Sequence, residues 1–176
     1  MRIADIPDTE TLQVIIKIIY AAALFYGCYS DIRRLQIPNA VSLVVLALFF
    51  FNYWLLQSPG NLMQHLLAAG IAFALTFGLY LAGGMGAGDV KLISALMLWG
   101  GATDGPAFLL IMTLIGGLFA GLLLALQKAM AVWPSIHRYF PSRRLKAWAR
   151  RGIFPYGVAI CIAGLLCIPS FFAPLR

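Results

Sequence analysis

The chain has 176 residues, of which 62% are apolar and 11% are charged, and its formal net charge is +7. Soluble domains contain about a quarter charged residues and fewer than half apolar ones, so this composition excludes a soluble enzyme, a free nucleic-acid-binding protein and a disordered chain. Six membrane helices of about 20 residues would use about 120 residues and leave only short connections. The composition therefore predicts an all-α, polytopic membrane protein in which residues 1–176 form a single domain.

Apolar runs separated by turn or charge signals predict about six transmembrane helices. They lie at about residues 12–30, 40–57, 61–83, 89–102, 106–127 and 153–174. Segments 57–60 and 103–106 each contain Gly and Pro, which predicts a tight turn at both. The first run follows acidic residues, whereas a secretory signal begins with basic ones, so we expect this run to remain in the mature protein.

The distribution of basic residues predicts the orientation of these helices. Ten of the 13 Lys and Arg residues fall in the odd-numbered connections, most of them in the basic loop 128–152. Because basic residues favour the cytoplasmic side, both termini are predicted outside and this loop inside. The fourth run gives about 21 Å of helix, which is shorter than a hydrocarbon core of about 30 Å. A re-entrant fourth helix would move the basic loop outside, so we predict a span whose Gly-rich start lies below the membrane surface.

The basic loop 128–152 also predicts a partner. It mixes Trp133, Tyr139, Phe140 and Trp148 with Arg and Lys, a pattern found both in nucleic-acid-binding proteins and in interfacial helices. Next to membrane helices, a basic interfacial face meets the anionic lipid of the inner leaflet. We therefore expect membrane lipid, and not nucleic acid, as the partner of this loop.

Only two of the six acidic residues, Asp31 and Asp89, fall on the predicted cytoplasmic side, each at the end of an apolar helix. Acidic residues at membrane depth are functional by default, although each could also be an ordinary helix-end charge beside a basic residue. Asp89 follows four glycines in six residues, which permit close backbone approach. After Asp31, Pro38 ends any helical continuation and Asn39 can cap the next helix. Both carboxylates are therefore predicted at one depth.

Two carboxylates at one depth predict acid/base chemistry. Like charges a few ångströms apart do not both ionise easily, so such a pair shares a proton. The ionised member can take a proton from water while the protonated member polarises a peptide carbonyl, which hydrolyses the bond without a covalent intermediate. His65 and His137 are predicted away from the pair, the three cysteines form no CxxC motif, and two aspartates are too few ligands for a metal ion. No metal and no cofactor is therefore expected.

Three segments resemble motifs of the type IV prepilin peptidase family, the GxGD membrane aspartic proteases. Residues 86–92, Gly-Ala-Gly-Asp-Val-Lys-Leu, look like its GxGD motif, and residues 31–39 resemble its first catalytic segment. Residues 151–157 are similar to the Pro-Tyr-Gly element that opens its last helix. The three segments occur in order, and the resemblance covers essentially the whole chain.

The resemblance implies that Asp31 and Asp89 are the catalytic pair of an aspartic endopeptidase. Other residues of the same segments are candidates that support the site: Pro38, Asn39, Gly86, Gly88, Lys91, Pro155 and Tyr156. Lys91 could either keep the neighbouring carboxylate ionised or contact lipid phosphate. Tyr156 could contact substrate or only shape the last helix.

The resemblance also implies the substrates: prepilins and pilin-like proteins, whose basic leader is removed at the cytoplasmic face of the bacterial inner membrane. The short chain without a cysteine-rich N-terminal domain looks like the CpaA/TadV-like branch, which serves Flp-type (Tad) pili. N-methylation is not expected, because the four-cysteine insertion of the bifunctional members is absent. The glycines before Asp89, Gly88 in particular, would let a substrate backbone approach closely.

Other functions fit parts of the pattern. A small proton- or cation-coupled transporter subunit would place its aspartates near the bilayer midplane on discontinuous helices. A non-catalytic partner in a secretion assembly would leave the Gly-rich segment before Asp89 without a purpose. Among GxGD proteases, a preflagellin-type or presenilin-like enzyme is the nearest alternative.

Overall fold

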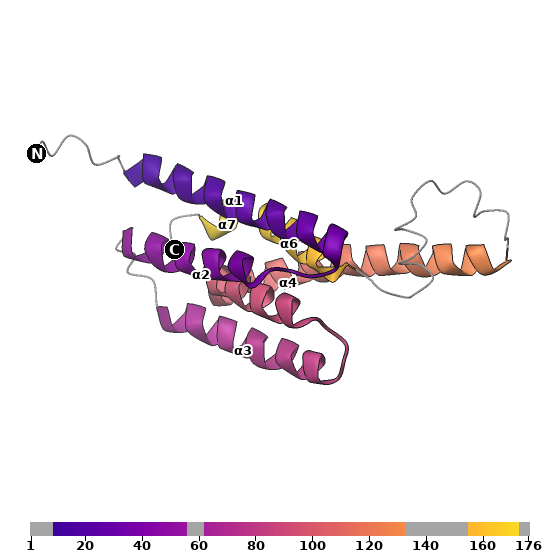
Figure 1. Cartoon of the computed structure of the whole chain (residues 1–176). Coiled ribbons are helices and arrows are strands. Elements are labelled where there is room, and N and C mark those ends of the chain that lie inside the picture. The colour runs from indigo at the N-terminus through magenta and orange to yellow at the C-terminus, as the bar shows by residue number, and fades with distance from the viewer. Residues whose placement is uncertain (1–8, 56–61, 133–154, 173–176) are drawn as a thin grey trace, which may run out of the picture.

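The computed structural model describes residues 9–55, 62–132 and 155–172, which form α-helices and contain no strand (Figure 1). The helices are α1 (Thr9–Arg34), α2 (Asn39–Leu55), α3 (Leu62–Leu81), α4 (Ala87–Val132), α6 (Tyr156–Leu166) and α7 (Ile168–Phe171). By length and composition α1, α3 and α4 can each cross a membrane, and α2 and α6 are shorter apolar helices. The predicted all-α membrane fold is therefore confirmed, while the number of six crossings stays a prediction.

Helix α4 consists of two segments that meet at Gly101. This residue has φ 57° and ψ −154°, a conformation that essentially only glycine adopts. The second segment runs back past the first towards the end of the bundle at which α4 begins (Figure 1). The predicted turn at 103–106 is wrong, because these residues are helical and the reversal occurs earlier. Proline is tolerated near the start of a helix, so Pro106 does not interrupt the second segment.

The remaining boundaries differ from the predicted ones by a few residues. Helix α1 extends beyond the predicted run at both ends, and the last predicted run contains two helices, α6 and α7. Helix α4 continues to Val132, so the first residues of the predicted basic loop 128–152 are helical. The rest of that loop lies outside the described residues.

Three parts of the chain meet at one end of the bundle. They are the α1–α2 connection, the α3–α4 connection and the N-terminus of α6, all on the right in Figure 1. Helices α1 and α6 pack closely because glycines lie between them. A Cβ added at Gly164 would come within 2.9 Å of Leu24, and one at Gly27 within 3.2 Å of Cys161. This packing brings the last turn of α1 beside the first turn of α6.

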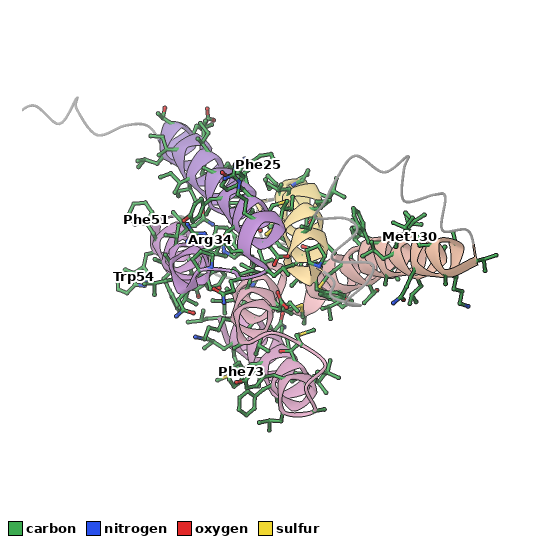
Figure 2. The ribbon with its side chains drawn as sticks, turned by 45° about the vertical axis from the view of Figure 1, so that its right-hand side comes forward. Phe25, Arg34, Phe51, Trp54, Phe73 and Met130 are labelled. Carbon is green, nitrogen blue, oxygen red and sulfur yellow. The ribbon has the colours of Figure 1, made fainter. Side chains whose placement is uncertain are left out.

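The core lies towards the opposite end and is aromatic. Tyr20 and Phe49 both place ring edges against Trp99, at centroid distances of 5.2 and 5.7 Å. The indole N–H of Trp99 donates to the carbonyl of Val45 over 3.0 Å, which ties α4 to α2. Buried polar groups need such partners. The outer surface, by contrast, carries exposed apolar side chains such as Phe25, Phe51, Trp54 and Phe73, as expected for a surface in contact with lipid (Figure 2).

Candidate active site

Asp31 lies in the last turn of α1 and is buried, with 4% of its surface exposed. Its Oδ2 accepts a hydrogen bond of 3.1 Å from the backbone N–H of Val158, and the N–H of Gly157 interacts with the same carboxylate. These N–H groups belong to the first turn of α6, and that of Val158 is shared, because it also donates to the carbonyl of Pro155 over 3.2 Å. The residue at the N-cap of α6 is Pro155, whose side chain makes no cap hydrogen bond. Asp31 supplies that cap from another helix.

Asp89 is the third residue of α4 and is half-buried. Its Oδ2 accepts a hydrogen bond of 3.3 Å from the N–H of Gly86, the residue before the helix. The carbonyl of Gly86 in turn accepts from the N–H of Val90 over 3.2 Å. The Asp89 bond is one half of a capping box, in which the side chain of the third helical residue reaches back to the N-cap, while the bond from Val90 is the ordinary first bond of the helix. Each aspartate therefore holds the beginning of a helix, α6 or α4, where the helix dipole favours negative charge.

The two carboxylates line one cavity. It has a volume of about 410 Å³ and lies at the end of the bundle where the two connections meet. Its lining residues are Asp31, Leu35, Gln36, Ile37, Gly86, Ala87, Gly88, Asp89 and Tyr156. Asp31 and Asp89 are close enough to interact electrostatically. The structure thus brings together, from two different helices, the two aspartates that the sequence singled out.

The α1–α2 connection forms one wall of this cavity. It leaves α1 through Leu35, whose φ of 54° is rare for a residue with a side chain. The N–H of Leu35 donates to the carbonyl of Asp31 over 2.8 Å, and the Ser30 hydroxyl donates to the carbonyl of Gln36 over 2.9 Å. Pro38 directly precedes α2, as expected for a residue that ends helical continuation. These bonds hold a sharp connection immediately after the Asp31 carboxylate.

Ile37 packs against two glycines. Gly88 directly precedes Asp89, and Gly157 lies in the first turn of α6. A Cβ added at Gly88 would lie 3.0 Å from the carbonyl oxygen of Ile37, and one at Gly157 would lie 2.6 Å from its Cδ1. A Cβ at Gly157 would also come within 2.8 Å of Oδ2 of Asp31. From the sequence alone, the space at Gly88 is expected to receive a substrate backbone. That expectation is corrected: a segment of the protein itself occupies the space.

The other glycines of the motif have separate roles. Gly83 has φ 76°, so it forms the turn that ends α3. A Cβ at Gly86 would lie 3.1 Å from Oδ2 of Asp89, so this glycine accommodates the carboxylate. Because Gly86 and Gly88 carry no side chains, the protein packs tightly around the Asp89 carboxylate.

Tyr156 is the first residue of α6 and faces the cavity. Its ring lies against Gly116 of α4, because a Cβ added there would come within 2.9 Å of Cε2 of Tyr156. The neighbouring Gly117 has nothing within 4 Å of such a Cβ. The contact of Gly116 with Tyr156 has no sequence signal. Ile37 was likewise missed, whereas Gly157 belongs to the Pro-Tyr-Gly element already noted.

Lys91 lies on the outer side of α4 and is exposed. Its ammonium donates a hydrogen bond of 3.0 Å to Oδ1 of Asn39, at the start of α2. Asn39 was expected to cap α2, but the structure gives its side-chain oxygen to Lys91. The ammonium thus bonds to α2, and the two expectations for Lys91, a contact with the neighbouring carboxylate and a contact with lipid phosphate, stay predictions.

No group of three or more His, Cys, Asp and Glu side chains that could hold a metal ion occurs in the described part of the chain. His65 lies away from the cavity: it is buried, and its Nδ1 is 2.8 Å from the carbonyl oxygen of Leu98. His137 lies outside the described residues. The arrangement around Asp31 and Asp89 therefore has the chemistry of two carboxylates.

Comparison with known protein families matches residues 18–121 to a family described as the type IV leader peptidase family. The matched segment is more than half of the chain and contains both Asp31 and Asp89. No curated protein and no solved structure matches the chain.

Proposed function

The chain belongs to the type IV leader peptidase family, and from this membership we propose that it is an aspartic endopeptidase that removes the basic leader from prepilins and pilin-like proteins. The observation that carries the proposal is the cavity that Asp31 and Asp89 line together. Two carboxylates in one cavity can hydrolyse a peptide bond with water alone.

The surroundings of the two aspartates differ, which supports separate roles. Asp31 is buried, and Oδ2 accepts from Val158 at the N-terminus of α6. Hydrogen bonds from backbone N–H groups and a helix N-terminus favour the ionised form of a carboxylate. Asp89 accepts the longer hydrogen bond, 3.3 Å from the N–H of Gly86, which favours its ionised form less. We assign the ionised state to Asp31 and the protonated state to Asp89.

These states give a complete hydrolysis. Asp89 donates its proton to the carbonyl oxygen of the scissile bond while the Asp31 carboxylate takes a proton from water, whose oxygen attacks the carbonyl carbon. When the tetrahedral intermediate collapses, the carbonyl oxygen returns a proton to Asp89, and Asp31 gives its proton to the departing amine. Both carboxyl groups end as they began, so no cofactor takes part.

The position of the cavity suits a prepilin. Both aspartates lie at helix ends, Asp31 in the last turn of α1 and Asp89 in the first turn of α4. A scissile bond between a basic leader and an apolar membrane helix would lie at such an interface. A transporter would need these charges near the middle of the bundle, so their location favours the peptidase.

The distribution of charge supports a location in the bacterial inner membrane with the cavity facing the cytoplasm. Arg33 and Arg34 lie in the last turn of α1 beside the cavity, and Lys91 lies in the first turns of α4. Basic residues of this kind favour the cytoplasmic side. Within the family, we propose a Flp-type (Tad) prepilin as the substrate to test first.

Incubation of the purified chain with a Flp-type prepilin tests this function. We expect mass spectrometry to show one cut, after a Gly at the boundary between leader and apolar helix, and no cut when Leu replaces that Gly in the substrate. A preflagellin offered in parallel tests the nearest alternative. Cleavage of the preflagellin alone would assign the chain to that activity instead.

A further inference from the structure

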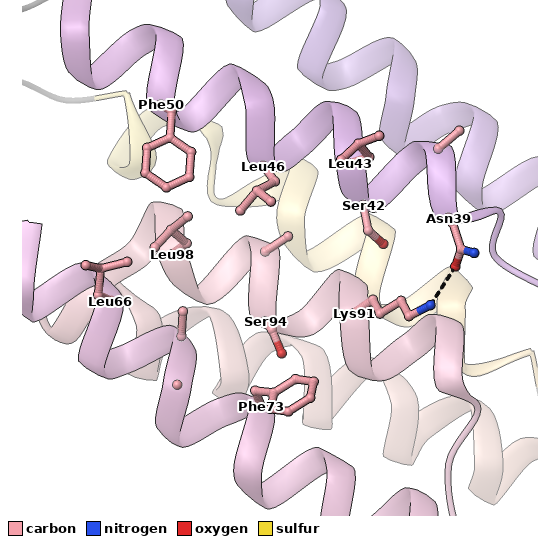
Figure 3. Close-up of a pocket in the computed structure, with 14 residues that line it drawn as sticks. Asn39, Ser42, Leu43, Leu46, Phe50, Leu66, Phe73, Lys91, Ser94 and Leu98 are labelled. Atoms are coloured by element: carbon pink, nitrogen blue, oxygen red, sulfur yellow. Dashed lines mark hydrogen bonds between the residues drawn. The ribbon is translucent and has the colours of Figure 1, made fainter.

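A second, larger hollow lies between α2, α3 and α4, and Lys91 lines one end of it (Figure 3). Its volume is about 810 Å³. The side chains that line it are apolar along most of its length and polar at one end. The apolar ones include Leu43, Leu46, Phe50, Leu66, Phe73 and Leu98, and the polar ones are Asn39, Ser42, Lys91 and Ser94. We call this hollow the α2–α4 groove.

The polar end of the groove contains a cation and a hydroxyl group that lacks a partner. Lys91 is exposed and donates to Asn39 (Figure 3). Ser42 is buried, with 8% of its surface exposed, and its Oγ has no hydrogen-bond partner among the described residues. Leaving a buried hydroxyl unpaired costs free energy. The Ser42 oxygen itself is inaccessible from the groove, so a ligand with oxygen acceptors at this end would contact the Lys91 ammonium.

The dimensions of the groove restrict what fills it. From Asn39 to Phe50 it follows α2 for about 16 Å, which is about the depth of one leaflet. An extended acyl chain of one leaflet's depth matches the length of this apolar stretch.

We propose that the α2–α4 groove binds an anionic phospholipid. An acyl chain lies along Leu43, Leu46 and Phe50, and the phosphate lies against the Lys91 ammonium. No acidic side chain lines the groove, so nothing there repels a negative headgroup. A zwitterionic lipid carries a compensating positive charge close to its phosphate and is held less strongly.

The first experiment measures headgroup preference. The purified full chain in detergent micelles is titrated with dioleoyl phosphatidylglycerol or dioleoyl phosphatidylcholine, and bound lipid is counted by native mass spectrometry. We expect the anionic lipid to bind about fivefold more tightly, the effect of one lysine near an anionic lipid. Lys91→Gln should reduce this preference by about fivefold. Lys17→Gln, on α1 and outside both the groove and the basic loop 128–152, should retain it.

A second pair of variants tests the location. Gly70 and Gly78 both lie on α3, and a Cβ added at either finds nothing within 4 Å, but only Gly70 lines the groove. Gly70→Leu should weaken the binding of both lipids, and Gly78→Leu should leave it unchanged. Circular dichroism checks that both variants fold.

Four results would overturn the proposal. They are equal affinities for the two lipids, an unchanged preference in Lys91→Gln, equal binding by the two leucine variants, and displacement of the lipid by inorganic phosphate or by an apolar helical peptide. Displacement by phosphate would assign the polar end to a free anion, and displacement by the peptide would assign the groove to a helix.

Discussion

The carbonyl oxygen of Ile37 lies so close to Gly88 that a Cβ at that glycine would be 3.0 Å from it. Ile37 belongs to the connection after Asp31, and Gly88 directly precedes Asp89. The contact therefore joins the two segments that carry the acidic side chains. On the other side Ile37 meets Gly157, whose neighbour Val158 donates to Asp31. One buried isoleucine thus sets the spacing of three chain segments around the cavity.

Gly88→Val should disturb this spacing. The added side chain meets backbone as well as side-chain atoms of Ile37, so the α1–α2 connection must shift. We expect a loss of about 1–3 kcal/mol in stability from overpacking. We also expect cleavage to slow by about tenfold or more, because a displaced carboxylate no longer fits the reacting bond. Thermal unfolding and initial cleavage rates measure both effects.

The control is Gly84→Ala, in the α3–α4 connection that precedes Gly88. A Cβ at Gly84 makes only an ordinary contact, 3.5 Å from the carbonyl oxygen of Leu79. This variant should keep the stability and activity of the unmodified chain. If Gly88→Val performed as well as Gly84→Ala, the contact with Ile37 would not determine the geometry of the site.

Gly116→Val should move the Tyr156 ring. A Cβ at Gly116 would come within 2.9 Å of that ring, and the end of a side chain can turn away at little cost in stability. Because Tyr156 lines the cavity with both aspartates, we expect kcat to fall by about tenfold while the melting temperature changes by only a few degrees. Gly117→Val, one residue along α4 and without neighbours within 4 Å, provides the comparison. Equal kcat values in the two variants would contradict a role for the position of Tyr156.

Chelators should not affect cleavage. The proposed hydrolysis uses two carboxylates and water, so an excess of EDTA leaves the initial rate unchanged. The control is the same assay after addition of Mg²⁺, Ca²⁺ or Zn²⁺, which should also change nothing. Inhibition by EDTA that one of these ions reverses would indicate a metal-dependent site.

The orientation of the bundle can be measured with single cysteines. In a chain whose three native cysteines are replaced by Ala, we introduce Gln36→Cys beside the cavity or Thr103→Cys near the turn at Gly101; both positions are exposed. A membrane-impermeant maleimide should label Thr103→Cys in intact cells and Gln36→Cys only after permeabilisation. Labelling of both positions in intact cells would contradict the predicted orientation.

Much of the architecture could be predicted from the sequence, because apolar runs and basic connections report directly on membrane helices and their order. The same order of connections placed Asp31 and Asp89 at one end of the bundle without any knowledge of packing. The turn at Gly101 could not be predicted in the same way. Segment 103–106 contains the stronger turn residues, and only the packing of His65 against Gly101 shows where the chain reverses.

The contacts that fix the site depend on side chains far apart in the sequence. Nothing in the pattern around Gly116 predicts that it faces Tyr156, and nothing near Asn39 predicts that its amide pairs with Lys91. The role of Gly88 was misjudged for the same reason. A glycine next to a functional group indicates close approach, but the sequence does not tell whether the approaching atoms belong to the substrate or to the protein itself.

The rate of prepilin cleavage by Asp31→Asn and Asp89→Asn tests the central claim most directly. Asparagine keeps an oxygen that can accept from the N–H of Val158 or of Gly86, so the caps of α6 and α4 remain while the acid/base group is lost. We predict that each variant is inserted in the membrane and unfolds near the temperature of the unmodified chain, yet cleaves at least about a hundredfold more slowly. A rate close to that of the unmodified chain in either variant would show that the two aspartates only cap helices, and would contradict the account.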